Sequence, residues 1–381
     1  MKRFLSYLLV AVLASGITFF LVGNQGNAYS KLVELEAIID NYFVDEMDHE
    51  AVKDAAAEAM VEALNDRWSY YMTAAEYKSY QEKMANSYVG IGVNITKRED
   101  GYITIVKVEE NGSAAEAGIQ PEDVLTAVEQ QDIAAMTIDE VKDLVRGKEG
   151  TTVNLTLLRA GESYTVAVER RTIQSVVAKA TLLDHNIGLV KIVNFDSRCA
   201  EETLAAVESL LEQGAKALIF DVRFNPGGYK HELVEILDYL LPEGPLFRSV
   251  DYRGKESVDT SDAQCLEVPM AVLINGDSYS AAEFFAAALS EYGVAELVGQ
   301  PTTGKGHFQS TFSLSDGSAA VISIGKYCTP NGVSLTDVGL TPDILVEIDD
   351  ETYAQVYYGT LLPEEDPQIG AAVDALLLQL A

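Results

Sequence analysis

Residues 270–293 read MAVLINGDSYSAAEFFAAALSEYG. The run MAVLIN is typical of a buried strand, and the stretch after the polar turn has the apolar spacing of a helix. Ser280 therefore lies where a strand gives way to a helix. Free amides and the dipole at a helix start can stabilise negative charge on a substrate carbonyl, so the position suits a nucleophile. The alternative is that Asp277, Ser278 or Ser280 only caps the helix.

The same alternation continues outward from this segment. Strand-like runs IGLVKIVNF and ALIFDVR precede it, each followed by a helical stretch, and the strand-like runs AELVGQ and SAAVISIGKY follow it. The chain ends in DPQIGAAVDALLLQLA, which has a helical period. We expect a layered α/β domain over residues 173–349 and a helical tail over residues 350–381.

Two different patterns come before this domain. Residues 30–86 contain KLVELEAIIDNYF and AVKDAAAEAMVEAL, whose apolar spacing predicts a helical segment. Residues 87–172 show short alternating strands separated by glycine, such as YVGIGVNI and TVNLTLLR, with two interposed helical stretches. Thr137 and Glu140 form a capping box at the second of these helices. The chain is thus predicted to be a multidomain protein with α/β and β parts.

The first residues have a separate character. Lys2 and Arg3 precede an almost uncharged apolar run over residues 4–23, which is long enough to span a bilayer. Residues 1–29 therefore suit a signal peptide or a membrane anchor, and the cleavage pattern GNA at residues 26–28 is weak. Both alternatives predict export, either as a protein associated with the membrane through this segment or as a secreted or periplasmic one.

Composition excludes several classes of function. The 381 residues carry a formal net charge of -32, which opposes binding to nucleic acid or to anionic lipid head groups. The three cysteines are odd in number and widely spaced, so they predict no disulfide framework. The four histidines lack the spacing of metal ligands. We expect neither a metal nor a cofactor.

A lysine in a second segment is a candidate base. Lys305 lies in PTTGKGHFQS, a loop with flanking glycines directly after the strand-like run AELVGQ. Burial lowers the pKa of a lysine, and the neutral amine can then take a proton from a serine hydroxyl. The alternative is an isolated surface lysine.

A third segment is a candidate oxyanion hole. The run IFDVRFNPGGY places Gly227 and Gly228 after a buried strand and before a helix. Adjacent glycines let backbone amides face a ligand with no side chain in the way. The alternative is an ordinary strand-helix turn.

Together these segments resemble the carboxyl-terminal processing peptidases, also called tail-specific proteases, which are Ser-Lys enzymes that carry a PDZ domain. DSYSAAE is similar to the family's GSASASE, DVRFNPGG to DLRNNPGG, TPNGVSL to TPxGxSI, and LNDRWSYYM to LDPYSxYM. The resemblance covers nearly the whole chain after residue 29. The sequence departs from the family at Phe224, Tyr279, Ala282 and residues 65–67. The large side chains of Phe224 and Tyr279 can narrow the substrate pocket and alter the choice of substrate.

The resemblance implies a set of roles for the site. Ser280 would be the nucleophile and Lys305 the base, since 305 minus 280 gives the 25-residue spacing of the family. Gln309, four residues past the lysine, would hydrogen-bond to the amine and orient it. The oxyanion would be held by backbone amides of Ala281 and of Gly227 or Gly228.

The β-rich part resembles the family's PDZ domain through YVGIGVNI, NGSAAEAGIQPEDVLTAVEQQDI and LVRGKEGTTVNLTLLR. A PDZ groove binds an extended chain as an added strand, and its glycine-rich loop can hold a terminal carboxylate. The matching positions are Val89, Gly90, Ile91 and Gly92. The alternative is a PDZ domain that serves only as a lid or a strut. The resemblance also implies a crotonase/ClpP-like fold for the α/β serine peptidase domain.

The function expected from the resemblance is that of an exported serine endopeptidase whose partners are protein or peptide substrates with accessible C-terminal tails. A homodimer or a regulator is a further partner considered from the resemblance. One alternative is a catalytically weak PDZ-containing tail-binding or scaffold protein, which the intact spacing of Ser280, Lys305 and Gln309 opposes. Another is an acyl-CoA enzyme of crotonase-like architecture, which leaves the PDZ domain unexplained.

Overall fold

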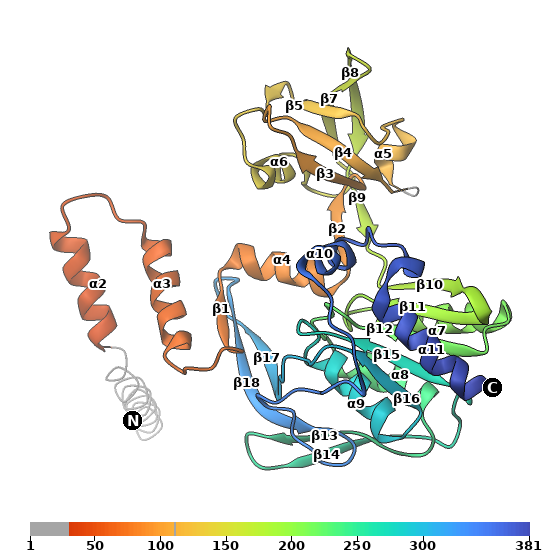
Figure 1. Ribbon diagram of the computed structural model, residues 1–381. Helices are drawn as coiled ribbons and strands as arrows, with labels where there is room; N and C mark the ends of the chain where they lie inside the picture. Colours follow the sequence, from red (N-terminus) through yellow and green to blue (C-terminus); the bar gives the residue numbers. More distant parts are fainter. Residues whose placement is uncertain (1–29, 110–111) are drawn as a thin grey trace, which may run out of the picture. The chain divides into compact units, whose positions relative to one another are not determined.

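Figure 1 shows the computed structural model, which describes residues 30–109 and 112–381. The chain divides into two compact units, with residue 65 the last of the first. The signal peptide or anchor expected over residues 1–29 lies outside the described residues. In the part of the chain that the structure does describe, no helix combines the length and the apolar character that crossing a membrane requires.

The first unit contains the two helices that the apolar spacing predicts, α2 (Ser30–Tyr42) and α3 (His49–Glu62). Asp48 caps α3, because its carboxylate accepts hydrogen bonds from the amides of Glu50 and Ala51 at 3.0 and 3.1 Å.

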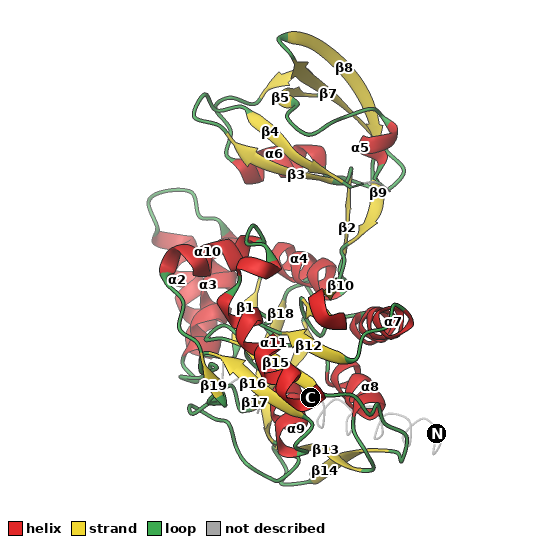
Figure 2. Ribbon diagram, turned by 45° about the vertical axis from the view of Figure 1, so that its right-hand side comes forward, coloured by secondary structure: helices red, strands yellow, loops and turns green. Residues whose placement is uncertain are grey.

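In the second unit, a β-rich module is built on a sheet of order β3-β4-β5-β7-β8, with β6 paired to β5 (Figure 2). On β7, Val153, Leu155 and Leu157 are fully buried, whereas Asn154 is exposed. This period of two places one face of the strand on the core. The elements of the module are β2 (Ser87–Gly90), β3 (Val93–Lys97), β4 (Ile103–Val108), α5 (Ser113–Glu116), β5 (Val124–Val128), β6 (Gln131–Asp132), α6 (Ile138–Val145), β7 (Thr152–Arg159), β8 (Glu162–Glu169) and β9 (Arg171–Gln174).

Local features of the module agree with the sequence. The capping box of α6 is present, since Thr137 Oγ1 accepts from the Glu140 amide at 3.2 Å and Glu140 Oε2 accepts from the Thr137 amide at 2.6 Å. The two ends of the module meet, because β2 pairs antiparallel with β9 from Ser87 opposite Gln174 to Gly90 opposite Arg171.

The α/β domain contains a six-stranded sheet of order β10-β11-β12-β15-β16-β19. Strands β10 and β11 are antiparallel, and the remaining neighbours are parallel. Its strands are β10 (Ala178–Leu183), β11 (Ile187–Ile192), β12 (Ala217–Asp221), β15 (Met270–Ile274), β16 (Ala295–Gly299) and β19 (Ile344–Leu345).

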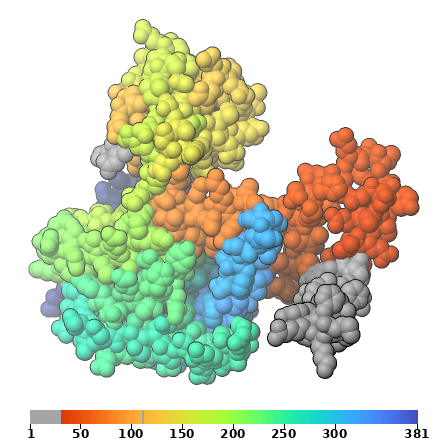
Figure 3. Space-filling model, turned by 180° about the vertical axis from the view of Figure 1, so that it is seen from behind, coloured from red at the N-terminus to blue at the C-terminus, as the bar shows by residue number. Residues whose placement is uncertain are grey.

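Helices cover both faces of this sheet. Leu218 and Phe220 of β12 belong to one core cluster with α7, α8 and α9, while Ile219 belongs to a second cluster with α11. Burial on both faces explains why β12 and β15 read as continuous apolar runs. Figure 3 shows the segments that carry α7, α8, β13 and β14, coloured green to teal, side by side on one surface. The helices are α7 (Cys199–Glu212), α8 (Lys230–Leu240), α9 (Ala281–Glu291) and α11 (Pro367–Leu380).

A second sheet of the α/β domain has the order β1-β18-β13-β14, and β17 pairs with β18. It joins segments that are far apart in the sequence, since Tyr70 lies opposite Val321 and Arg248 opposite Cys328. Helix α4 (Ala74–Met84) follows β1. The strands of this sheet are β1 (Tyr70–Met72), β13 (Gly244–Asp251), β14 (Glu256–Ser261), β17 (His307–Ser313) and β18 (Ala319–Cys328).

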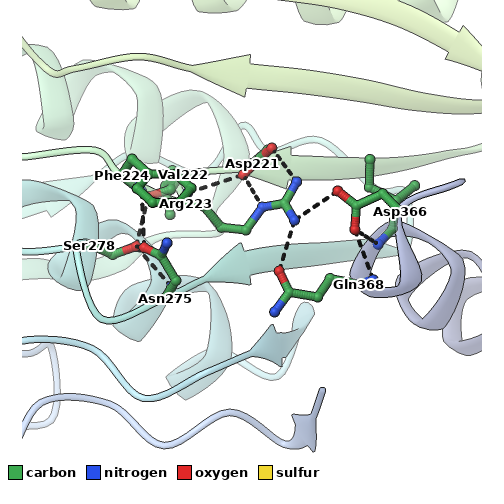
Figure 4. A network of polar contacts seen from close by, with 9 residues as sticks. Asp221, Val222, Arg223, Phe224, Asn275, Ser278, Asp366 and Gln368 are labelled. Carbon is green, nitrogen blue, oxygen red and sulfur yellow. Dashed lines mark hydrogen bonds and ion pairs between the residues drawn. The ribbon is translucent and has the colours of Figure 1, made fainter. Parts of the chain in front are cut away.

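The C-terminal tail contains α10 (Asp350–Tyr358) and α11, and a buried arginine ties α11 to the sheet (Figure 4). The guanidinium of Arg223 pairs with Asp221 at 2.8 Å and with Asp366 at 2.9 Å. It also donates to Gln368 Oε1 at 2.8 Å. Asp366 caps α11, so this network fixes the end of β12 that leads into the Pro-Gly-Gly turn.

Candidate active site

Ser280 lies on a strained turn between β15 and α9. Its backbone has φ 59° and ψ -126°, a region that residues other than glycine rarely adopt. Such strain persists only where the surrounding structure enforces it, and it is concentrated at functional sites. The Oγ of Ser280 accepts a hydrogen bond from the hydroxyl of Tyr327 at 3.0 Å. The turn therefore presents the serine oxygen to β18.

A buried carboxylate holds the Ser280 turn against the Lys305 loop. Glu283 Oε2 accepts from the amides of Ser280 at 3.0 Å and Lys305 at 2.9 Å. Its Oε1 accepts from the Gly304 amide at 2.7 Å and from Thr302 Oγ1 at 2.5 Å. Burial raises the pKa of Glu283, while these four donors lower it. One side chain thus fixes the spacing of the two candidate catalytic segments.

Lys305 extends from its loop into an aromatic environment. Its Nζ lies 4.6 Å from the ring centroid of Trp68 and 5.9 Å from that of Tyr279. Burial lowers the pKa of Lys305 to about 8, although the carboxylates of Asp66 and Glu283 act to raise it. A neutral amine is therefore accessible at mildly alkaline pH, which suits a general base.

One cavity of about 960 Å³ brings the three predicted catalytic residues together without joining them. Ser280, Lys305 and Gln309 all line it. Among the described residues, no hydrogen bond connects the Lys305 amine to Ser280 or to Gln309. Gln309 Nε2 instead donates to the carbonyl of His307 and to Ser323 Oγ, both at 3.0 Å.

The Pro-Gly-Gly turn packs directly on the serine. A Cβ added to Gly227, whose φ is 87°, would lie 2.7 Å from Ser280 Cβ and 2.8 Å from the Ala281 nitrogen. A Cβ on Gly228 would lie 2.3 Å from the carbonyl carbon of Phe195. Only glycine fits either position, so the turn can approach a carbonyl that is attacked by Ser280.

The amides near Ser280 differ in their availability. The Gly227 N–H donates to Asn225 Oδ1 at 2.9 Å. For the N–H groups of Gly228 and Ala281, the described part of the chain provides no acceptor. These two amides are therefore the free donors beside the serine.

Two side chains after β15 hold the Pro-Gly-Gly turn in place (Figure 4). Ser278 Oγ donates to the carbonyl of Val222 at 2.8 Å, and Asn275 Oδ1 accepts from the Phe224 amide at 3.0 Å. Both contacts join the ends of β12 and β15. Ser278 is thus a structural link between the two strand ends.

Some side chains of the cavity were not identified from the sequence as functional. The sequence indicates no role in the site for the aromatic residues after Asp66, but Trp68 contacts the Lys305 amine. Asp66 fixes this segment, because its carboxylate accepts from the Trp68 amide at 3.1 Å and from Ser69 Oγ at 2.6 Å. For Tyr327, the one feature of the sequence that could have indicated a functional role is its position two residues before the family-like motif TPNGVSL.

A buried carboxyl group also lines the cavity. Asp196 is 3% exposed, and burial raises its pKa to about 7. The charge of Lys83 lowers this pKa and that of Glu232 raises it. The cavity thus contains a second group that titrates near neutral pH.

The predicted peptide-binding residues lie at the start of the β-rich module. Val89 and Gly90 belong to β2, and the Ile91 carbonyl accepts from the amide of Ala114 at 2.9 Å. Gly92 follows before β3 begins. The loop thus leads from β2 into β3 beside α5.

Comparisons with known proteins agree with this architecture. Residues 186–346 match peptidase family S41, and residues 104–159 match the PDZ domain. The chain is 32% identical over 372 residues to the carboxy-terminal processing protease CtpA of Bacillus subtilis (strain 168), covering 94% of this chain and 79% of that protein. It is 29% identical over 354 residues to a probable CtpA-like serine protease of Staphylococcus epidermidis (strain ATCC 12228 / FDA PCI 1200), covering 90% and 72%.

Two solved structures are similar to this chain, and the first of them supports the fold. A putative S41 protease from Bacteroides fragilis aligns with a TM-score of 0.54 at 15% identity, covering 85% of this chain and 90% of that one. The photosystem II D1 C-terminal processing protease aligns with a TM-score of 0.49 at 25% identity, covering 84% and 88%.

The hydrogen bonds that Glu283 accepts from the Ser280 and Lys305 amides, called the Glu283 bridge below, should support both stability and activity. Glu283→Gln keeps the shape of the side chain but replaces one acceptor with an N–H₂ group, so a buried amide donor loses its partner. We expect the free energy of unfolding to fall by about 1–3 kcal/mol, and peptidase activity to fall with it. Urea unfolding and peptide cleavage measure the two effects.

The matched control is Glu140→Gln. Glu140 makes the same type of capping contact on the surface of the β-rich module. Glutamine can take the place of glutamate at this position of a capping box. This variant should change stability little and leave activity intact. Equal effects of the two substitutions would contradict the role given to Glu283.

Proposed function

Since the chain belongs to peptidase family S41, as a serine protease of the carboxy-terminal processing type with a PDZ domain, we propose that it is an exported endopeptidase. It would cut proteins near their C-terminal tails by a Ser-Lys mechanism. The observation that carries this proposal is the Glu283 bridge, which holds the turns of Ser280 and Lys305 together at one cavity. The lowered pKa of Lys305, about 8, supports its role as the base.

Acylation follows from these positions. The Ser280 Oγ proton passes to the neutral Lys305 amine while Oγ bonds to the substrate carbonyl carbon. The oxygen becomes an oxyanion, which the free amides of Gly228 and Ala281 stabilise. The C–N bond then breaks, and Lys305 gives its proton to the leaving amine. Deacylation repeats these steps with water as the nucleophile and Ser280 Oγ as the leaving group.

Lys305 must leave the aromatic rings for this proton transfer. In the structure its amine lies over Trp68, and a rotation of the side chain toward Ser280 brings base and nucleophile together. Gln309 supports this arrangement, because two hydrogen bonds from its Nε2 fix the amide group. Its Oε1 can then accept one N–H of the amine and orient it.

Tail recognition is assigned to the PDZ domain. Strand β3 is at the edge of its sheet, so an extended peptide can pair with it. The loop of Val89, Gly90, Ile91 and Gly92 leads into β3, where its amides can bind the terminal carboxylate. The catalytically weak tail-binding protein is the second candidate function, favoured by the absence of a Lys305–Ser280 hydrogen bond among the described residues.

Export is proposed from the sequence of residues 1–29, with its basic start and long apolar run. The segment would either be removed or keep the protein at the membrane with the peptidase outside the cytoplasm. The N-terminal residue of the protein recovered from culture medium and from membranes distinguishes the two. A protein that remains in the cytoplasm with Met1 intact would contradict export. Association as a homodimer or with a regulator stays a prediction.

The catalytic assignment is tested with Ser280→Ala and Lys305→Ala. Both should abolish cleavage of a peptide with a free C-terminal tail, and Ser280→Ala should abolish labelling by a fluorophosphonate. Tail binding, measured by fluorescence anisotropy, should persist in both. Wild-type protein that binds the tail but neither cleaves it nor takes the label would favour the tail-binding function.

The pKa of Lys305 sets the pH dependence. The neutral amine is the active form, so kcat/KM should rise about tenfold per pH unit below pH 8 and level off above it. The matched control is Asp196→Asn, which removes a carboxyl group of the cavity whose pKa is raised to about 7 and should leave the midpoint in place. A midpoint near 7 that vanishes in this variant would assign the profile to Asp196 instead.

A further inference from the structure

Tyr327 makes a polar contact to the nucleophile that the mechanism above does not use. Its hydroxyl donates to Ser280 Oγ at 3.0 Å. The ring is held by aromatic neighbours, with centroids 4.3 Å from Phe284, 5.4 Å from Phe247 and 6.1 Å from Phe308. The residue is 4% exposed. The aromatic packing therefore fixes the direction of the hydroxyl.

The hydroxyl is a permanent donor. Burial raises the pKa of Tyr327 far above its ordinary value, although the hydrogen bond to Ser280 lowers it and the charge of Glu283 raises it further. Tyr327 therefore keeps its proton and does not compete with Lys305 as a base. Within the described part of the chain, Ser280 Oγ is the one hydrogen-bond partner of this hydroxyl.

Packing does not account for the hydroxyl. A phenylalanine would fill the space among Phe247, Phe284 and Phe308, and a buried hydroxyl costs free energy unless it is hydrogen-bonded. The hydroxyl meets Ser280 Oγ, on which negative charge is expected to develop as its proton passes to Lys305. This points to a role in the chemistry.

We propose that Tyr327 is a catalytic residue that donates a hydrogen bond to Ser280 Oγ and stabilises the negative charge on this oxygen. The inference rests on the proposed Ser-Lys mechanism and deepens it. Because Tyr327 occupies one lone pair of Oγ, the serine proton points elsewhere and is free to pass to Lys305. A hydrogen bond to a charged oxygen is about twice as strong as one to a neutral oxygen.

The contact acts at two steps. During acylation the Ser280 proton goes to Lys305 Nζ, and the Tyr327 O–H stabilises Oγ while its bond to the carbonyl carbon forms. During deacylation the C–Oγ bond breaks, and Oγ takes the electron pair of that bond and then the proton held by Lys305. The Tyr327 hydrogen bond stabilises the departing oxygen until that proton arrives. Tyr327 loses no proton at either step.

The test is Tyr327→Phe, which keeps the ring and removes the donor. We expect kcat/KM for a tail peptide, and the rate of fluorophosphonate labelling at Ser280, to fall about 10- to 100-fold. The pH midpoint near 8 should not move, because Tyr327 does not supply the titrating group. The matched control is Tyr292→Phe, which removes a hydroxyl bonded to the Pro245 carbonyl at 3.1 Å and should leave both rates unchanged.

A stability measurement tests the contact without any use of activity. In the Ser280→Ala background the Tyr327 hydroxyl lacks its acceptor, so adding Tyr327→Phe should raise the melting temperature. In the wild-type background the same change should lower it or leave it unchanged. Equal shifts in both backgrounds would show that the bond is not formed in solution and would overturn the proposal.

The outcomes separate this inference from the proposed function. If wild-type protein takes no label at Ser280, the Ser-Lys mechanism fails, and the inference fails with it. If wild-type protein is labelled and Tyr327→Phe reacts equally fast or faster, the Ser-Lys mechanism stands and the role of Tyr327 is refuted. A slower Tyr327→Phe with an unmoved pH midpoint supports the proposal.

Discussion

The hydrogen bonds to the buried Glu283 carboxylate are the interaction on which the rest of the site depends. The proposed nucleophile and base come from separate loops, one after β15 and one after β16, and parallel pairing alone does not set the distance between such loops. Glu283 accepts hydrogen bonds from the backbone amides of both Ser280 and Lys305, and these bonds fix the distance between the two loops. The bridge binds neither side chain, so the Lys305 amine can move toward Ser280 without breaking it. A rigid backbone with a mobile lysine is consistent with a site that is completed when substrate binds.

The surrounding fold supports the site from two directions. Ser278 and Asn275 join the ends of β12 and β15, which holds the Pro-Gly-Gly turn against the serine. Behind that turn, Arg223 links β12 to the cap of α11. The second sheet contributes Gln309 from β17 and Tyr327 from β18. The cavity is therefore lined from a mostly parallel sheet, which supplies the proposed nucleophile and base, and from an antiparallel sheet, which supplies the groups proposed to orient them.

Much of this could be predicted from the sequence, and the misses have physical causes. Strand and helix periods predicted the α/β layers, and the strand-helix junction predicted the position of Ser280, because these signals are local. The pairing of β1 with β18 was not predicted, since it joins residues about 250 positions apart, as at Tyr70 and Val321. For the same reason the contact of Trp68 with Lys305 and that of Tyr327 with Ser280 could not be found. The partners of Gln309 depend on the β17–β18 register, which no local pattern encodes.

The central claim is that the Lys305 amine leaves Trp68 and acts on Ser280. The most direct test is a crystal structure of the protein with a peptide boronate or aldehyde bonded to Ser280 Oγ. The account predicts Lys305 Nζ within about 2.7–3.2 Å of Oγ, with the adduct oxygen on the amides of Gly228 and Ala281. An adduct on Ser280 with Lys305 still over Trp68, and another group in contact with Oγ, would contradict it.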